Sequence, residues 1–124
     1  MKPITVTIPT CDHGDVTIDE PMWCAGDHPA GGYRVDITHR GPEMVLDVLT
    51  SRGRPRLLSL ALESRPFTEL PPGTSVFVNV GISDDFYPHT VADLHRLAET
   101  LMLHASRVRY MAGRLAIQLG EDQR

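Results

Sequence analysis

The hydrophobic pattern of this chain changes its period once, close to Thr90, and this change limits the folds that the chain can adopt. Before Thr90, apolar residues alternate with polar ones in short runs, which is typical of β-strands with one buried face. After Thr90, apolar residues recur at alternating spacings of three and four, which places them on one face of a helix. The sequence therefore predicts an α+β fold that ends in one long helix.

The part of the chain before Thr90 predicts a mainly antiparallel sheet of five to six strands. Segments rich in glycine and proline separate the strands and allow only short connections, which favours antiparallel pairing. One of them, residues 52–55, is expected to form a hairpin turn between two strongly apolar runs. The expected strands cover residues 4–8, 16–18, 33–38, 44–49, 57–62 and 75–80.

The expected helix covers residues 90–119 and packs on one face of this sheet. Thr90 and Asp93 form a capping-box pattern at its start, and Gly120 is a plausible stop. Alanines repeat every seven residues on its apolar face, so a helix–helix dimer seam is the alternative to packing on the sheet.

A second apolar stripe lies on the opposite side of the expected helix, where a surface helix should be polar. It consists of Leu103, Tyr110 and Ile117, spaced seven residues apart. This stripe predicts a second buried contact, such as the interface of a twofold homodimer.

Length and composition predict a single globular domain over residues 1–124. Hydrophobic residues make up 41% of the chain and charged residues 23%, which is ordinary globular usage. No stretch approaches the roughly 20 apolar residues that span a bilayer, and the N-terminus does not resemble a signal peptide. The net charge of −4 disfavours a general nucleic-acid binder, which usually has a basic face. We expect a cytoplasmic protein that contacts neither membrane nor nucleic acid.

Cysteine and histidine are concentrated in the first 39 residues. Zinc prefers thiolate and imidazole ligands in a tetrahedral array, and residues 11–39 could form a metal knuckle. Cys24 and His28 have the spacing of a ligand pair, His39 could fold back from the next strand, and Glu20 could add an oxygen ligand. The alternative is a buried thiol among hydrogen-bonded turn histidines. The candidate ligands are Cys24, His28, His39, Cys11 and His13.

Three short motifs resemble a family of short actinobacterial proteins known only as a domain of unknown function. They are His13-Gly14 before a strand, Pro21-x-Trp23-Cys24 with His28, and His39-x-Gly41-Pro42. Many members have C-P-x-W-C-x-x-x-H and a later histidine, which resembles a Cys₂His₂ zinc site. The resemblance implies that Cys24, His28 and His39 are ligands. Here Glu20 stands in place of the first cysteine, which leaves the fourth ligand open.

Two other features offer weaker candidate sites. The turn containing Arg52, Arg54 and Arg56 could hold a phosphate or an acidic partner, although a solvated hairpin tip explains it as well. Cys24 with a histidine could form a nucleophile pair, but no third residue is available to orient it.

These observations predict a small non-enzymatic binding or accessory protein with a structural zinc site and an unidentified protein or small-molecule partner. One alternative is a metal-dependent enzyme in which three protein ligands leave a position for water. Another is a nucleic-acid-linked regulator that uses the arginine-rich turn.

Overall fold

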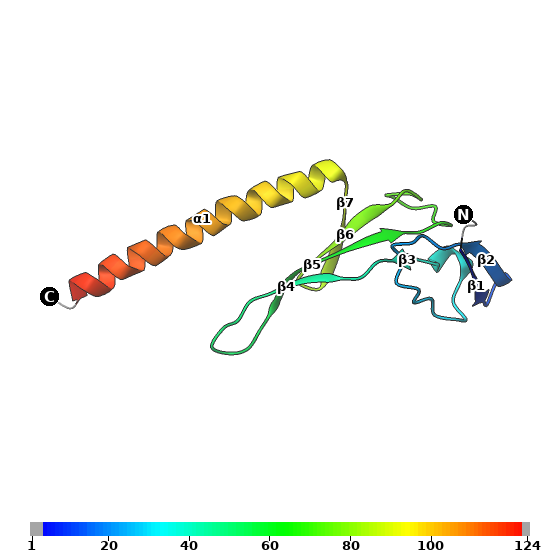
Figure 1. Cartoon of the computed structure of the whole chain (residues 1–124), viewed down its shortest axis with the longest axis horizontal. Helices are drawn as coiled ribbons and strands as arrows, with labels where there is room; N and C mark the ends of the chain where they lie inside the picture. Colours follow the sequence, from blue (N-terminus) through cyan, green and yellow to red (C-terminus); the bar gives the residue numbers. More distant parts are fainter. Residues whose placement is uncertain (1–3, 123–124) are drawn as a thin grey trace. The chain divides into compact units, whose positions relative to one another are not determined.

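The computed structural model describes residues 4–122 of the chain (Figure 1). They form two compact units, of which the first ends at His89 and the second begins at Thr90. The boundary falls where the period of the hydrophobic pattern changes. The first unit contains all the described strands and the second is a single helix, so the α+β class is confirmed. A single domain, with the helix packed on the sheet, stays a prediction.

The first two strands form a hairpin of their own. Strand β1 (Thr5–Thr10) pairs antiparallel with β2 (Gly14–Asp19), and Thr10 faces Gly14 at the turn. Gly14 has a φ of +63°, which glycine adopts without steric cost. The hydroxyl of Thr10 donates to the Gly14 carbonyl and accepts from the amide of His13. The strands expected over residues 4–8 and 16–18 are therefore joined as a hairpin.

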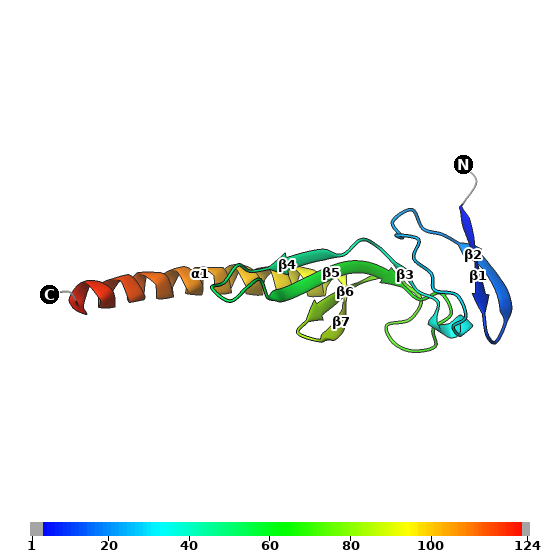
Figure 2. The same cartoon turned by 90° about the horizontal axis from the view of Figure 1, so that it is seen from below.

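The other five strands form one antiparallel sheet in the order β3-β5-β6-β7, with β4 also paired to β5. Strands β3 and β4 both lie on the edge of β5 that β6 leaves open, one after the other, and Figure 2 shows β4 beside β5. The buried core includes Leu58, Ala61, Phe77 and Val80. The strands are β3 (His39–Arg40), β4 (Met44–Asp47), β5 (Arg56–Ser64), β6 (Phe77–Ile82) and β7 (Asp85–His89).

The strand predicted over residues 33–38 is wrong. Its centre forms the short 3-10 helix η1 (Arg34–Asp36), in which the Tyr33 carbonyl accepts from the amide of Asp36. The carboxylate of Asp12 also accepts from the amide of Arg34 at 3.0 Å. Ile37 is buried, whereas Tyr33 and Val35 are 59% and 46% exposed, so the alternating apolar residues do not form one buried face of a strand.

Strand β7 was missed by the sequence analysis. Its hairpin with β6 turns at Ser83, whose φ of +56° is unusual for a residue other than glycine. Pro88 lies within β7 and has no amide hydrogen to donate. This is tolerated because β7 is an edge strand.

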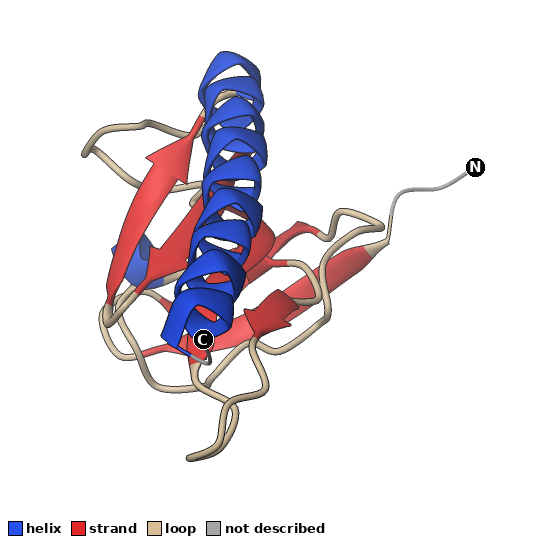
Figure 3. Cartoon of the chain, turned by 90° about the vertical axis from the view of Figure 1, so that its left-hand side faces the viewer, coloured by secondary structure: helices blue, strands red, loops and turns tan. Residues whose placement is uncertain are grey.

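Helix α1 (Val91–Asp122) is one uninterrupted helix (Figure 3). The capping box is confirmed, because the Asp93 amide donates to the Thr90 hydroxyl and the Thr90 amide donates to the Asp93 carboxylate. The helix continues through Gly120, which had been expected to stop it, and ends three residues beyond the predicted 119. No helix among residues 4–122 has the length and apolarity needed to cross a membrane.

Candidate metal centre

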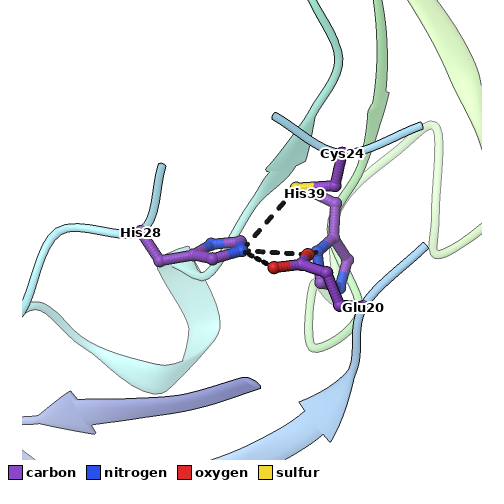
Figure 4. A group of neighbouring side chains, drawn as sticks. All are labelled: Glu20, Cys24, His28 and His39. Atoms are coloured by element: carbon purple, nitrogen blue, oxygen red, sulfur yellow. Dashed lines mark hydrogen bonds and ion pairs between the residues drawn. The ribbon is translucent and has the colours of Figure 1, made fainter. Parts of the chain in front are cut away.

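Four side chains with metal-binding atoms converge in the first unit. Glu20 follows β2 directly, Cys24 and His28 lie in the loop after it, and His39 begins β3. One ligand atom from each residue lies within 4.8 Å of all the others. Figure 4 shows the four side chains pointing toward a common point from separate segments of the chain.

Backbone hydrogen bonds hold the Cys24 end of the loop against the sheet. The Cys24 amide donates to the Pro21 carbonyl at 3.0 Å, and the Ala25 amide donates to the Arg40 carbonyl at 2.9 Å. The Gly26 amide lies 3.4 Å from the Cys24 sulfur and donates to it. The thiol is therefore oriented by the backbone on both sides of it.

Gly41 allows this loop to approach the sheet closely. A Cβ atom at position 41 would lie 3.1 Å from the backbone oxygen of Trp23, which is closer than nine in ten real contacts of a Cβ atom. The glycine therefore lets Trp23 and its neighbour Cys24 lie directly over the segment that follows His39.

Beyond His28, the loop is fixed to the end of β1 at residues 31–32. The Gly31 amide donates to the Pro9 carbonyl, and the Cys11 amide donates to the Gly32 carbonyl, both at 2.9 Å. Gly31 has a φ of +89°, which accounts for glycine at this bend. His28 is thus held between two anchored loop ends.

The distances within the cluster suit a tetrahedral metal site. Ligand bonds to zinc are about 2.0–2.1 Å for nitrogen and about 2.3 Å for sulfur, so a sulfur–nitrogen edge of the tetrahedron is about 3.6 Å. Cys24 Sγ lies 3.6 Å from His28 Nε2. The Glu20 oxygens lie 2.8 and 3.0 Å from His28 Nε2, and one of them lies 2.8 Å from His39 Nδ1. These nitrogen–oxygen pairs would have to separate by about 0.3–0.5 Å to reach the edge of about 3.3 Å that zinc requires.

The site is largely withdrawn from solvent. The side chains of His28 and His39 are each 5% exposed and that of Glu20 is 14% exposed. The rings of the two histidines are nearly perpendicular, with centroids 5.3 Å apart. Burial acts to raise the pKa of Glu20, but its hydrogen bonds with Cys24 and His28 outweigh this effect and lower the pKa. Burial, together with the neighbouring Glu20, raises the pKa of the Cys24 thiol.

The donor set also fits zinc in charge and type. A carboxylate, a thiolate and two neutral imidazoles carry a total charge of −2, which one Zn²⁺ neutralises. A buried site favours such neutrality, because an uncompensated charge is costly away from water. All three kinds of ligand are ones that zinc accepts.

The structure does not place two of the expected ligands in this cluster. Cys11 is exposed, and His13 pairs with the carboxylate of its neighbour Asp12 at 2.9 Å. Glu20 stands with Cys24, His28 and His39 instead. The signal for it was its position just before Pro21, where the resembled motif has a cysteine.

The weaker candidate sites lie elsewhere. Arg56 pairs with Glu43 at 3.0 Å across the hairpin, and Arg52 and Arg54 are exposed at its tip. Leu103, Tyr110 and Ile117 are each more than half exposed on α1.

Comparison with known proteins places most of the chain in one family. No curated protein and no solved structure matches the chain. One family model, described as a domain of unknown function (DUF6907), matches residues 5–117, which includes both sheets, the cluster and most of α1. The chain therefore belongs to the DUF6907 family.

Proposed function

We propose that Glu20, Cys24, His28 and His39 bind one zinc ion as a structural site, in a small non-enzymatic binding or accessory protein. The observation that carries this is the convergence of four suitable ligand atoms within 4.8 Å in a nearly buried site. The loop between β2 and β3 is rich in glycine and proline and contains little regular structure. A metal would join Cys24 and His28 of this loop to Glu20 at the end of β2 and to His39 in β3. Its binding free energy would then contribute to folding.

The test is the metal content of protein purified without added metal, measured by mass spectrometry. We expect about one zinc per chain, as in tetrahedral structural sites. The variants Cys24→Ser and His39→Ala should lose the metal and melt at a lower temperature. Cys11→Ser and His13→Ala are matched controls outside the cluster and should keep both. A metal-free protein whose melting none of these substitutions changes would contradict the proposal.

The alternative is a catalytic metal held by three protein ligands with water in the fourth position. Glu20 supports this alternative, because a carboxylate can change the way its oxygens bind a metal and so leave a position for water. Both oxygens of Glu20 contact His28 in the structure. X-ray absorption on the zinc-loaded protein separates the two. Four protein ligands, one of them sulfur, support the structural site, and three with a water support an enzyme.

The proposal extends to a homodimer formed through α1. Its apolar residues follow spacings of three and four, which is typical of helix–helix contacts. Leu103, Tyr110 and Ile117 add a second exposed apolar stripe. Sedimentation should give a dimer mass, and Leu103→Glu with Ile117→Glu should give a monomer, whereas a monomeric parent protein would contradict this part.

We place the protein in the cytoplasm. Both cysteines are free thiols, and the proposed site uses Cys24 as a thiolate. A reducing compartment preserves such a ligand. Fractionation of cells that express the chain tests this location, and recovery outside the cytoplasm would contradict it.

A further inference from the structure

A cavity of about 480 Å³ lies beside the metal cluster, within the first unit. This volume is within the range of small-molecule sites. Its walls come from the end of β1, from the loop and η1 between residues 27 and 38, and from β3 and β5. Ile8, Tyr33 and Ile37 supply apolar surface.

The proposed metal would hold one wall of this cavity in place. His28 lines the cavity, and His39 follows directly after the last residue of the loop wall, Thr38. The two histidines therefore lie close to both ends of the segment that forms this wall, and Figure 4 shows that they converge. The shape of the cavity is thus linked to occupancy of the cluster.

A second wall presents two arginines that are fixed by one buried carboxylate. Glu63 is 2% exposed, and it accepts from Arg65 Nε and Nη2 at 3.1 and 2.8 Å and from Arg40 Nε at 3.3 Å. The guanidinium of Arg40 also lies over the ring of Phe86, and that of Arg65 over Phe77. Two guanidinium groups against one carboxylate leave one positive charge in surplus on this wall.

The loop wall has the opposite charge. Asp27 and Asp36 both line the cavity and are exposed. Within residues 4–122, neither carboxylate forms an ion pair or accepts a side-chain hydrogen bond. The cavity is therefore lined by one set of side chains, Arg40 and Arg65, and by a second set, the carboxylates of Asp27 and Asp36, and within the described residues no ion pair joins the two sets.

From this arrangement we infer that the cavity binds a small zwitterion of the amino-acid class. Its carboxylate would contact Arg40 and Arg65, because guanidinium groups bind carboxylates through paired N–H donors. Its ammonium group would contact Asp27 and Asp36, and its side chain would lie against Ile8, Tyr33 and Ile37. A simple anion would be repelled by the loop wall and a simple cation by the arginine wall. The link to the metal rests on the proposed function.

The experiment measures binding of common free L-amino acids, one at a time, to the zinc-loaded full chain by calorimetry. Cysteine and histidine are left out because they chelate zinc in solution. The tightest binder is then compared with its N-acetylated and its amidated form. Each blocked form should bind at least about tenfold more weakly, because it loses one charge-assisted contact. Absence of binding by every amino acid tested, or equal binding of the blocked forms, overturns the inference.

Variants assign the two walls. Asp27→Asn with Asp36→Asn should weaken binding of the free amino acid about tenfold and leave that of its N-acetylated form unchanged. Arg40→Gln should weaken binding of the free amino acid about tenfold and leave binding of its amidated form unchanged. Asp47→Asn and Arg54→Gln, which lie away from the cavity, are the matched controls and should bind like the parent protein. A loss of affinity that is the same for free and blocked forms counts against the assignment.

Metal content is measured on the same samples, so that the two proposals can fail separately. Zinc uptake without amino-acid binding overturns the proposed role of the cavity and supports the proposed metal site. Amino-acid binding by a protein that takes up no zinc overturns the metal site and supports the cavity. Equal affinity of the zinc-loaded protein and of metal-free Cys24→Ser overturns the link between them.

Discussion

Cys24 Sγ lies 3.6 Å from Nε2 of His28, four residues further along the chain. This distance equals the sulfur–nitrogen edge of a zinc tetrahedron, about 3.6 Å. A hydrogen bond and a shared metal are both compatible with the pair. The position of Glu20 and His39 around the same point is what favours the metal.

Cobalt substitution tests the role of this pair directly. Co²⁺ in a tetrahedral site with one thiolate should give strong visible absorption and a sulfur-to-cobalt charge-transfer band. Cys24→Ser should abolish the charge-transfer band, whereas Cys11→Ser should leave the spectrum unchanged because Cys11 lies outside the cluster. A charge-transfer band that persists in Cys24→Ser would assign the sulfur ligand to another residue.

Zinc binding should release a proton from Cys24. Burial and the adjacent Glu20 raise the pKa of this thiol, so it is protonated at neutral pH before the metal arrives. Zinc affinity should therefore rise with pH until the pH passes the raised pKa, and fall as the solution becomes more acidic. Calorimetry in buffers of different ionisation enthalpy counts the protons. The variant Cys24→Asp, whose carboxylate is already ionised, should release about one proton fewer when it binds zinc.

The local pattern of the sequence predicted much of the fold and part of the cluster. Period-two alternation located β1 and β6, a strongly apolar run located β5, and the change of period located α1. The alternation at residues 33–38 misled because a contact distant in sequence, from Asp12 to the Arg34 amide, fixes a 3-10 turn there. Strand β7 was hidden because a proline in a strand is acceptable only at an edge, and edge position is a property of the whole sheet.

The composition of the cluster depends on chain path and not on spacing. Cys11 and His13 are as close to Cys24 in the sequence as many ligand pairs are. They lie at the hairpin turn, however, whereas Glu20 lies at the opposite end of β2. The length of β2 therefore decides which residue reaches Cys24. The resembled motif indicated that position 20 is a ligand position, although the motif has a cysteine there and this chain has Glu20.

Gly41→Ala should loosen the contact between the loop and the sheet. The added methyl group would meet the Trp23 backbone oxygen at 3.1 Å, and backbone cannot move as easily as a flexible side chain. We expect a loss of about 1–3 kcal/mol in the free energy of unfolding and weaker zinc binding. Gly32→Ala is the matched control, since nothing lies within 4 Å of its added Cβ. Equal stability of the two variants in denaturant titrations would refute this role of Gly41.

The cluster around Glu63 should respond unequally to removal of its partners. Arg65→Met leaves a carboxylate that is 2% exposed with its closest contacts removed, which should cost about 3 kcal/mol in the free energy of unfolding. Glu63→Gln should cost less, because the side chains of Arg40 and Arg65 are partly exposed and can be hydrated. Arg56→Met, which breaks an exposed pair with Glu43, should cost below about 1 kcal/mol. Urea denaturation gives the three values, and the reverse order would show that Glu63 does not need its arginines.

The start of α1 should depend on the ionised form of Asp93. A hydrogen bond from the Thr90 amide, supported by Arg96, lowers the pKa of Asp93 from 3.8 to about 2. Because the folded pKa is the lower one, the carboxylate stabilises the helix start above pH about 4, and this stabilisation is lost as the pH falls through about 2. Circular dichroism of the full chain between neutral pH and pH about 2 should therefore show loss of helix that is reduced in Asp93→Asn, since the amide does not titrate. Glu99 lies on the same helix but outside the capping box, so Glu99→Gln serves as the control and should keep the acid transition of the parent protein. An Asp93→Asn variant with the full acid transition would show that the capping box does not control it.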